Sequence, residues 1–526
     1  MAGELGASGR RHLSRPARLM SDADPGDIAQ RVREAATLLE AIADDRALLA
    51  GIDADDRLRL LRAAGQVSRP DATDRRRLLK ERRRQRSAER SDREETVLGE
   101  TGIRKLRRAA GFTPPNVFAP QEFEAGAVVD PVDDPDFREA VEPQNCYVCK
   151  QDYVAVHHFY DQLCPPCAEL NYHKRSETAD LRGRVALLTG GRVKIGYQAG
   201  IKLLRAGCSL IVTTRFPRDS ALRYAREPDF LDWKDRLEIF GLDLRHTPSV
   251  EAFCQHLLTT RDRLDFIISN ACQTVRRPPE FYQHMLALES GSLSDLPTDA
   301  RKLLGEYEGL RGYSLLPEGG AVPALATSEK GELAGLTRPA ELSQMALLPE
   351  EQASRSHLFP EGRLDQDLQQ VDLRDRNSWR LTLHEVSSVE LLEVQLVNAV
   401  APFILNARLK ALMLRTPERD KHIVNVSAVE GQFYRKFKTT RHPHTNMAKA
   451  ALNMMTRTSA TDYFRDGIHM NSVDTGWVTD EDPVEIASRK VEQHGFHPPL
   501  DIVDGAARIV DPIIAGFNTG EHVWGK

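Results

Sequence analysis

The sequence predicts an α/β fold, built as a doubly wound parallel sheet and preceded by a small metal-binding module and an α-helical region. Two observations carry this prediction. From about residue 181 to the C-terminus, apolar segments of strand length alternate with segments of helix length, the pattern of a parallel sheet covered by helices on both faces. Within this region, VALLTGGRVKIGYQAGIKLLRAGCSLIVT places a glycine-rich turn between a strand and a helix, followed by a second strand, as in nucleotide-binding folds.

The N-terminal region, residues 1–112, is predicted to be helical and rich in arginine. Apolar residues recur at helical spacing in DIAQRVREAATLLEAIADD, and DDRLRLLRAAGQV repeats the pattern on a shorter scale. The arginine run over residues 75–90 has almost no apolar stripe, which indicates a solvated helix or linker. The alternative is a docking surface for an acidic partner or for RNA phosphates, although no aromatic residues are interleaved there to stack on bases.

Residues 113–140 are rich in proline and acidic residues without a sustained period, and are predicted to form an extended linker. The last domain, 181–526, is interrupted at about 289–374 by a Gly-, Pro-, Ser- and Glu-rich insert. At a net charge of −5 the chain has no global attraction to nucleic acid or membrane. We find no run of about 18 apolar residues and therefore expect no membrane span. The cysteines are few and unevenly spaced along the chain, which favours a cytoplasmic location. The sequence leaves open whether the protein forms a homo-oligomer.

Four of the seven cysteines form two close pairs, separated by fourteen residues, within residues 141–180: Cys146, Cys149, Cys164 and Cys167. Two residues between cysteines let both thiolates bind one ion from a tight turn, and a second such pair completes a tetrahedral set. A closed four-sulfur site leaves no coordination position open, so its role would be structural. We therefore predict a structural Zn²⁺ in a zinc-ribbon-like module, with redox disulfides and an iron–sulfur centre as the alternatives.

The strand–turn–helix unit resembles the short-chain dehydrogenase/reductase family, over roughly residues 183–526 apart from the insert. The TGxxxGxG turn of that family is represented by Thr189, Gly190 and Gly196, with Lys194 in place of the middle glycine. We interpret Lys194 as an added charge at the phosphate site, beside Ile195. The resemblance implies a Rossmann fold that binds a nicotinamide dinucleotide.

Further landmarks of the family follow in order. The segment LDL matches the family position that borders the adenine ring, and FIISNAC resembles the family's strand that ends in the residues NAG. The family's helix with the structural and catalytic asparagine is represented by VNAVAPFIL, and its strand that ends at the catalytic serine by HIVNVSAVEG. The segment that caps the nicotinamide in the family is represented by NSVDTGWV. In this sequence these landmarks are Asp243 and Leu244, Asn270, Asn398, Ser427, and Thr475 with Gly476.

The end of the second strand indicates which dinucleotide is bound. An acidic residue there would bind a ribose 2′-hydroxyl and repel a 2′-phosphate. This chain instead carries Thr213, Thr214 and Arg215, and a guanidinium suits a phosphate. The sequence therefore favours NADP(H) over NAD(H). In the competing interpretation, Arg215 only caps the strand in solvent.

The proton donor of the family, a tyrosine four residues before the lysine, is replaced. Asn398, Ser427 and Lys449 match the other three catalytic positions, but Thr445 stands at the tyrosine position. An aliphatic hydroxyl has a far higher pKa than a phenol and cannot simply replace it as a general acid. The longer preceding loop offers His444 and Tyr434, while the third alternative is that no proton donor remains.

Two functions follow from these residues. The first is a divergent NADP(H)-dependent oxidoreductase that acts on a small-molecule carbonyl or alcohol substrate. The second is a non-catalytic NADP(H)-binding regulator or scaffold, which the loss of the tyrosine, the cysteine module and the arginine-rich region favour. The sequence names no substrate.

Overall fold

The computed structural model describes most of the chain and separates it into two compact units, residues up to Arg90 and Ser91–Lys526. The described residues are 25–68, 72–108, 139–305, 338–348, 351, 356–360, 370–434, 438–479, 481–483, 486, 489–490 and 497–526. The predicted linker at 113–140 lies outside them except for its last two residues, and so does a large part of the predicted insert.

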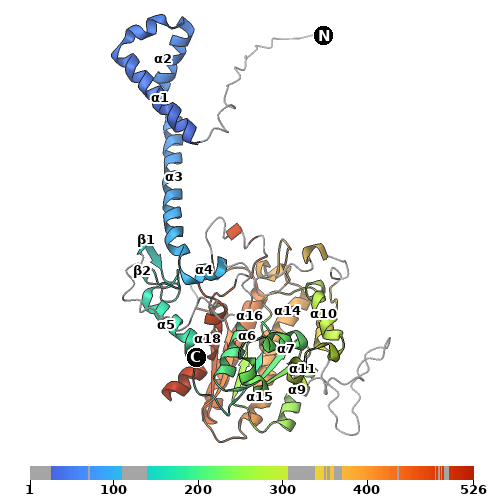
Figure 1. Ribbon diagram of the computed structural model, residues 1–526. Coiled ribbons are helices and arrows are strands. Elements are labelled where there is room, and N and C mark those ends of the chain that lie inside the picture. Colours follow the sequence, from blue (N-terminus) through green and yellow to red (C-terminus); the bar gives the residue numbers. More distant parts are fainter. Residues whose placement is uncertain are drawn as a thin grey trace, which may run out of the picture. The chain divides into compact units, whose positions relative to one another are not determined.

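The first unit is helical, as the apolar spacing predicts. It comprises α1 (Pro25–Asp44), the 3₁₀ turn η1 (Arg46–Gly51), α2 (Ala54–Ser68) and the first part of α3 (Ala72–Gly99). Asp45 caps η1 by accepting the Ala47 N–H at 2.9 Å. The arginine run falls within α3 (Figure 1), and its described side chains are exposed, as on a solvated helix.

The second unit contains a six-stranded parallel sheet (Figure 1), and the predicted fold class is confirmed. Its strand order is β5-β4-β3-β6-β7-β8. The chain enters the sheet at β3, adds β4 and β5 on one side, and then crosses back to add β6, β7 and β8 on the other. The order of the strands therefore reverses between β3 and β6, and in such sheets the crevice for a dinucleotide lies at this point. The strands are β3 (Val185–Thr189), β4 (Ser209–Thr214), β5 (Leu237–Gly241), β6 (Phe266–Ser269), β7 (Lys421–Ser427) and β8 (Ile468–Asp474). The C-terminal tail continues the sheet edge, because Gly525 N–H donates to Met470 O at 2.8 Å.

Apolar side chains from the strands and the helices that cover them form one continuous core. The central strands are buried on both faces; all seven residues of β7 are buried, as expected of a parallel sheet. The longer covering helices are α6 (Lys194–Arg205), α9 (Thr247–Thr260), α15 (Ala401–Met413), α16 (Pro443–Arg465) and α18 (Ile502–Thr519). Shorter elements are α7 (Pro217–Ala225), α8 (Phe230–Trp233), η2 (Lys234–Arg236), η7 (Ser378–Arg380), η8 (Leu383–Glu385) and η10 (Val429–Gly431).

One helical stretch, Ser388–Met413, is long and apolar enough to cross a membrane by length and composition alone, with a mean hydropathy of 1.5 in its most apolar window. The expectation of no such segment therefore misses one candidate. The stretch comprises α14 (Ser388–Gln395), a π-helical turn (Leu396–Val400) and α15. In the structure α15 packs on α9 and on strands β6 and β7, the position of a core helix.

The cysteine module consists of α4 (Gly102–Arg108), the antiparallel strands β1 (Glu139–Asn145) and β2 (Asp152–Ala155), and α5 (Pro165–Ser176). The first cysteine pair lies in the turn between the strands, and the second lies at the start of α5, where Cys164 is the N-cap residue. One cysteine pair is therefore held by a β-hairpin and the other by the start of a helix. The apolar core of the module also includes Val478, Leu500 and Ile502 of the sheet domain.

The described part of the predicted insert packs closely on the sheet domain. Its elements, with those just before it, are η3 (Pro279–Tyr282), α10 (Gln283–Ser290), η4 (Leu293–Asp295), α11 (Thr298–Leu303), α13 (Pro339–Ser343) and η6 (Ser356–Leu358). Leu296, Ala300 and Leu303 belong to the main core, so residues up to about 304 are structural. Ala340 and Phe359 pack instead on Tyr282 and Phe216 beside the end of β4.

Candidate functional site

A cavity of about 880 Å³ lies along the carboxyl ends of the strands. Residues that follow all six strands contribute to its lining, and so do residues from the segments around Trp379 and His442. Ligands of open parallel sheets bind at this edge. The cavity brings together most of the predicted site residues: Gly190, Lys194, Ile195, Gly196, Arg215, Asp243, Leu244, Asn270, Ser427, Lys449, Thr475 and Gly476.

The glycine-rich turn is held in place by the strand beside it. Asn270 Nδ2 donates to Thr189 O and Gly190 O, both at 3.2 Å, and Thr189 Oγ1 accepts the Ala271 N–H at 3.0 Å. Gly190 has φ +69°, and a Cβ there would lie 2.8 Å from Ala271 Cα. A Cβ on Gly196 would overlap Gly190 O and Asn270 Nδ2. Both glycines therefore allow the turn to pack closely against the start of α6 and the residues that follow β6.

Lys194 has a left-handed backbone conformation, with φ +55°, which non-glycine residues rarely adopt. Its Nζ lies 3.8 Å from a carboxylate oxygen of Glu481 across the cavity. Burial acts to raise the pKa of Glu481, but the charges of Lys194 and Arg277 lower it overall. Ile195 points away from the turn and packs where a Cβ of Gly505 would lie.

The end of β4 is an aromatic and cationic corner of the cavity. Arg215 Nη2 donates to Tyr282 Oη at 3.0 Å, and its guanidinium carbon lies 4.8 Å from the centre of the Tyr282 ring. Arg192 lies over Phe216 and pairs with a carboxylate of α7. No carboxylate lies within ion-pair distance of Arg215 among the described residues, whereas the predicted adenine-border residue Asp243 pairs with Arg245 at 2.6 Å.

At the other end, Ser427 and Lys449 lie on adjacent elements and both line the cavity. Lys449 Nζ donates to Val426 O at 2.7 Å, and Ser427 Oγ donates to Asn453 Oδ1 at 2.5 Å. Both side chains are at least 94% buried, so solvent does not compete for these bonds. Asn453 was not predicted, although it lies one helical turn after Lys449, on the same face of α16.

Asn398 lies outside the cavity lining, in the π-helical turn that precedes α15. Its Oδ1 accepts the Gln273 N–H at 2.8 Å and its Nδ2 donates to Gln273 O at 3.2 Å. Both polar atoms of the amide are thus bonded to one backbone residue. In this structure Asn398 therefore holds the loop after β6 and does not itself face the cavity.

The structure brings neither predicted proton donor into the cavity. Tyr434 is 100% exposed, and among the described residues it contributes nothing to the lining. His444 is buried on the opposite side of the helix start, where its Nε2 lies 3.4 Å from Glu390 Oε1. Thr445 is also buried, and its hydroxyl oxygen has no hydrogen bond. The replaced tyrosine position is therefore closed over rather than open to a ligand.

A different histidine, His442, does line the cavity. Its ring stacks on Trp379 with 3.9 Å between ring centres and 5° between planes. Its Nδ1 lies 3.2 Å from Asn446 Oδ1, and its backbone N–H donates to Leu381 O. Burial lowers the pKa of His442 below its ordinary value, although the charge of Glu430 opposes the effect. The imidazole is therefore neutral at pH 7 and held in one orientation.

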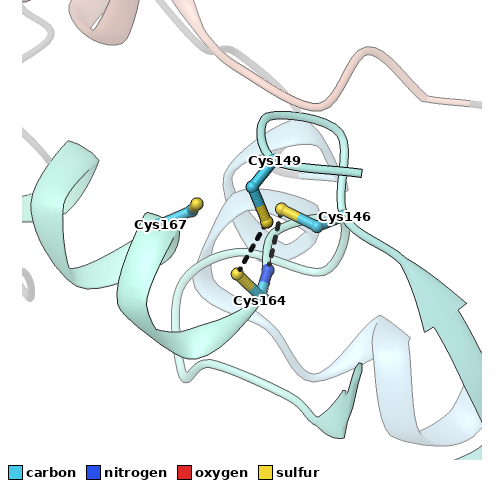
Figure 2. A group of neighbouring side chains, drawn as sticks. All are labelled: Cys146, Cys149, Cys164 and Cys167. Carbon is cyan, nitrogen blue, oxygen red and sulfur yellow. Dashed lines mark hydrogen bonds between the residues drawn. The ribbon is translucent and has the colours of Figure 1, made fainter. Parts of the chain in front are cut away.

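The four predicted cysteines converge (Figure 2). Their sulfur atoms lie within 4.8 Å of one another, and the Cys149 and Cys164 sulfurs are 3.5 Å apart, far beyond a disulfide bond. A tetrahedral S₄ zinc site has sulfur atoms about 3.8 Å apart, so the donor set fits such an ion. Burial acts to raise the pKa of Cys146, but backbone N–H groups of Cys164, Cys149 and Val148 lower it to about 6.

Comparison with known sequences gives a match to one family model and matches to individual proteins. Residues 375–495 match the sequence model of the enoyl-(acyl carrier protein) reductase family. The uncharacterized protein R665 of Acanthamoeba polyphaga mimivirus is 30% identical over 381 residues, which cover 70% of this chain and 71% of that protein. Dehydrogenase/reductase SDR family member 13 of Bos taurus is 31% identical over 118 residues, 22% of this chain and 29% of that protein.

Among solved structures, a short-chain dehydrogenase of Burkholderia cenocepacia in complex with NADP is 13% identical, with a TM-score of 0.38. The match covers 66% of this chain and 98% of that one. The parallel sheet is the fold class that the sequence predicts. This chain therefore belongs to one family with the mimivirus protein R665, and residues 375–495 within its sheet domain are similar to the enoyl-(acyl carrier protein) reductase family.

Proposed function

We propose that this protein is an NADP(H)-dependent oxidoreductase that interconverts a carbonyl and an alcohol. One observation carries the proposal: a single cavity joins the glycine-rich turn and Arg215 at one end to Ser427 and Lys449 at the other. Arg215 is suited to a ribose 2′-phosphate, because it has no carboxylate partner among the described residues and is braced by Tyr282. When bound, the dinucleotide supplies or accepts the hydride.

The proton is proposed to pass through His442 in place of the family's tyrosine. If Nδ1–H donates to Asn446 Oδ1, then Nε2 of the neutral ring is the atom that accepts a proton. Stacking on Trp379 fixes the plane of the ring. In alcohol oxidation His442 would take the hydroxyl proton, and in carbonyl reduction its protonated form would return it. We propose that Ser427 turns its hydroxyl proton from Asn453 to the same substrate oxygen. Lys449 would use an N–H not bonded to Val426 O to hold the cofactor's ribose.

We further propose that the cysteine cluster binds one structural Zn²⁺. Four thiolates would complete the coordination of the ion, so no position remains for a substrate. The separation of the sulfur atoms, which is far longer than a disulfide bond, supports metal binding over a disulfide.

The test combines binding with turnover on purified, zinc-loaded protein. Fluorescence titration should give a lower Kd for NADPH than for NADH, and a panel of aldehydes and ketones should contain at least one that oxidises NADPH. Tight NADPH binding without turnover on a broad panel, in both directions, would instead support the non-catalytic regulator or scaffold.

A further inference from the structure

The cysteine module and the cavity share one side chain, Tyr147. It lies between the first two cysteines, in Cys146-Tyr147-Val148-Cys149, yet its side chain lines the cavity together with Gly476 and Trp477. Its hydroxyl oxygen accepts the backbone N–H of Trp477 at 2.8 Å. A residue of the metal-binding turn therefore contacts the segment that follows β8 at the cavity wall.

The backbone around Tyr147 is fixed by the same turn that holds the cysteines. Tyr147 N–H donates to Gln162 O at 2.9 Å, and Cys164 N–H donates to Cys146 Sγ at 3.3 Å. Lys150 closes the turn with φ +63° and lies over the Tyr147 ring at 4.8 Å. A metal ion that joins the two cysteine pairs would therefore also determine where the Tyr147 ring projects.

The module holds the segment after β8 from its other side as well. Val478, Leu500 and Ile502 share one apolar cluster with the cysteine module. Arg175 of α5 pairs with Asp501 at 2.7 Å and with a second carboxylate of α18 at 2.8 Å. Gly476 in this segment packs closely on Leu500, because it has φ +75° and a Cβ there would lie 2.6 Å from Leu500 Cδ1.

We propose that metal binding at the four cysteines and dinucleotide binding in the cavity are energetically coupled, with Tyr147 as the positioning residue that links them. The inference rests on the proposed dinucleotide site. With the metal bound, Tyr147 holds the Trp477 backbone against the cavity, so the wall is formed before the ligand arrives. Without it, only hydrogen bonds and apolar packing join the two cysteine pairs, so the ligand must order more of the wall. Because coupling is reciprocal, bound NADPH should also slow the loss of metal.

The test uses the full chain, zinc-loaded or treated with a chelator, and reads hydrogen exchange at residues 474–479 together with NADPH affinity. Zinc removal should speed exchange in this segment and weaken NADPH binding about tenfold, equal to about 1.4 kcal/mol. In zinc-loaded protein, Tyr147→Ala should give a similar loss at unchanged zinc content, and Tyr147→Phe a smaller one. Tyr153→Phe is the matched control, because that hydroxyl donates to Asp161 O inside the module.

The variants keep the test decisive if zinc removal unfolds the protein, because they retain zinc and their folding can be checked by circular dichroism. Folded Tyr147→Ala protein with wild-type NADPH affinity and wild-type exchange at 474–479 would overturn the coupling. Protein that binds no dinucleotide at all would overturn the proposed function. In that case the exchange of residues 474–479 with and without zinc would still confirm or refute the structural link.

Discussion

At the scale of single residues, Arg215 is expected to set the preference between the two dinucleotides. Arg215→Asp places a carboxylate where a 2′-phosphate would lie, so it should weaken NADPH binding by about 10- to 100-fold, because an attraction becomes a repulsion. NADH binding should be unchanged or improved. Fluorescence titration measures both, and Arg226→Asp, an exposed position outside the cavity lining, is the control. Equal losses for both dinucleotides would contradict the assignment.

His442 is expected to carry the proton transfer. His442→Asn should lower kcat by about 10²- to 10⁴-fold, the usual range for loss of a general acid–base group. Asparagine tolerates the left-handed conformation of this residue, φ +42°, so the fold should persist. His444→Asn, outside the cavity, should have a much smaller effect on kcat. The opposite ranking in steady-state assays would return the role to His444.

The pH dependence of the reaction follows from the lowered pKa of His442. Oxidation of an alcohol needs the neutral ring, so its rate should fall as the pH drops through this pKa, below about 6.5. Reduction of a carbonyl needs the protonated ring, so its rate should fall as the pH rises through the same value. Rate profiles in both directions check the prediction, and their inflection should vanish in His442→Asn.

At the scale of elements, the strand–turn–helix unit is where the sequence predicts most. The two strands expected on either side of the glycine-rich turn and its helix are observed at Val185–Thr189 and Ser209–Thr214, because apolar runs and glycines act locally. Ser427 and Lys449 are predicted for a different reason, the resemblance of their segments to family motifs, and both line the cavity. His442, Trp379 and Tyr147 could not be predicted, since their roles arise from contacts between segments that are far apart in the chain.

The turn before α6 offers a test of this local argument. Gly196→Ala adds a Cβ that would overlap Gly190 O and Asn270 Nδ2, so the turn must move. We expect a loss of about 1–3 kcal/mol in the free energy of unfolding and a loss of dinucleotide binding. Gly65→Ala in α2, with no atom within 4 Å of the added Cβ, should be neutral or stabilising by up to about 1 kcal/mol. Urea unfolding and NADPH titration measure the two effects.

At the scale of the whole molecule, the amino ends of strands β7 and β8, opposite the cavity, carry a cluster of three histidines. His422, the second residue of β7, lies beside His469 of β8 and His522 of the C-terminal tail, whose ring centres are 5.2 and 5.1 Å from that of His422. The His422 and His522 rings also share a hydrogen bond of 2.9 Å. Burial, followed by the charges of the other two histidines, lowers the pKa of His422 well below 6.5.

This cluster should make the protein sensitive to acid. In the unfolded chain His422 binds a proton below about pH 6.5, but in the folded chain it stays neutral to a much lower pH. The unfolded state therefore binds more protons in this window. The free energy of unfolding must decrease as the pH is lowered, by up to about 1.4 kcal/mol per pH unit for one group. Urea unfolding at pH 7 and pH 5 should show a smaller difference in His422→Gln than in wild type. His384→Gln, at an exposed position, should retain the wild-type difference, and an unchanged difference in His422→Gln would contradict the prediction.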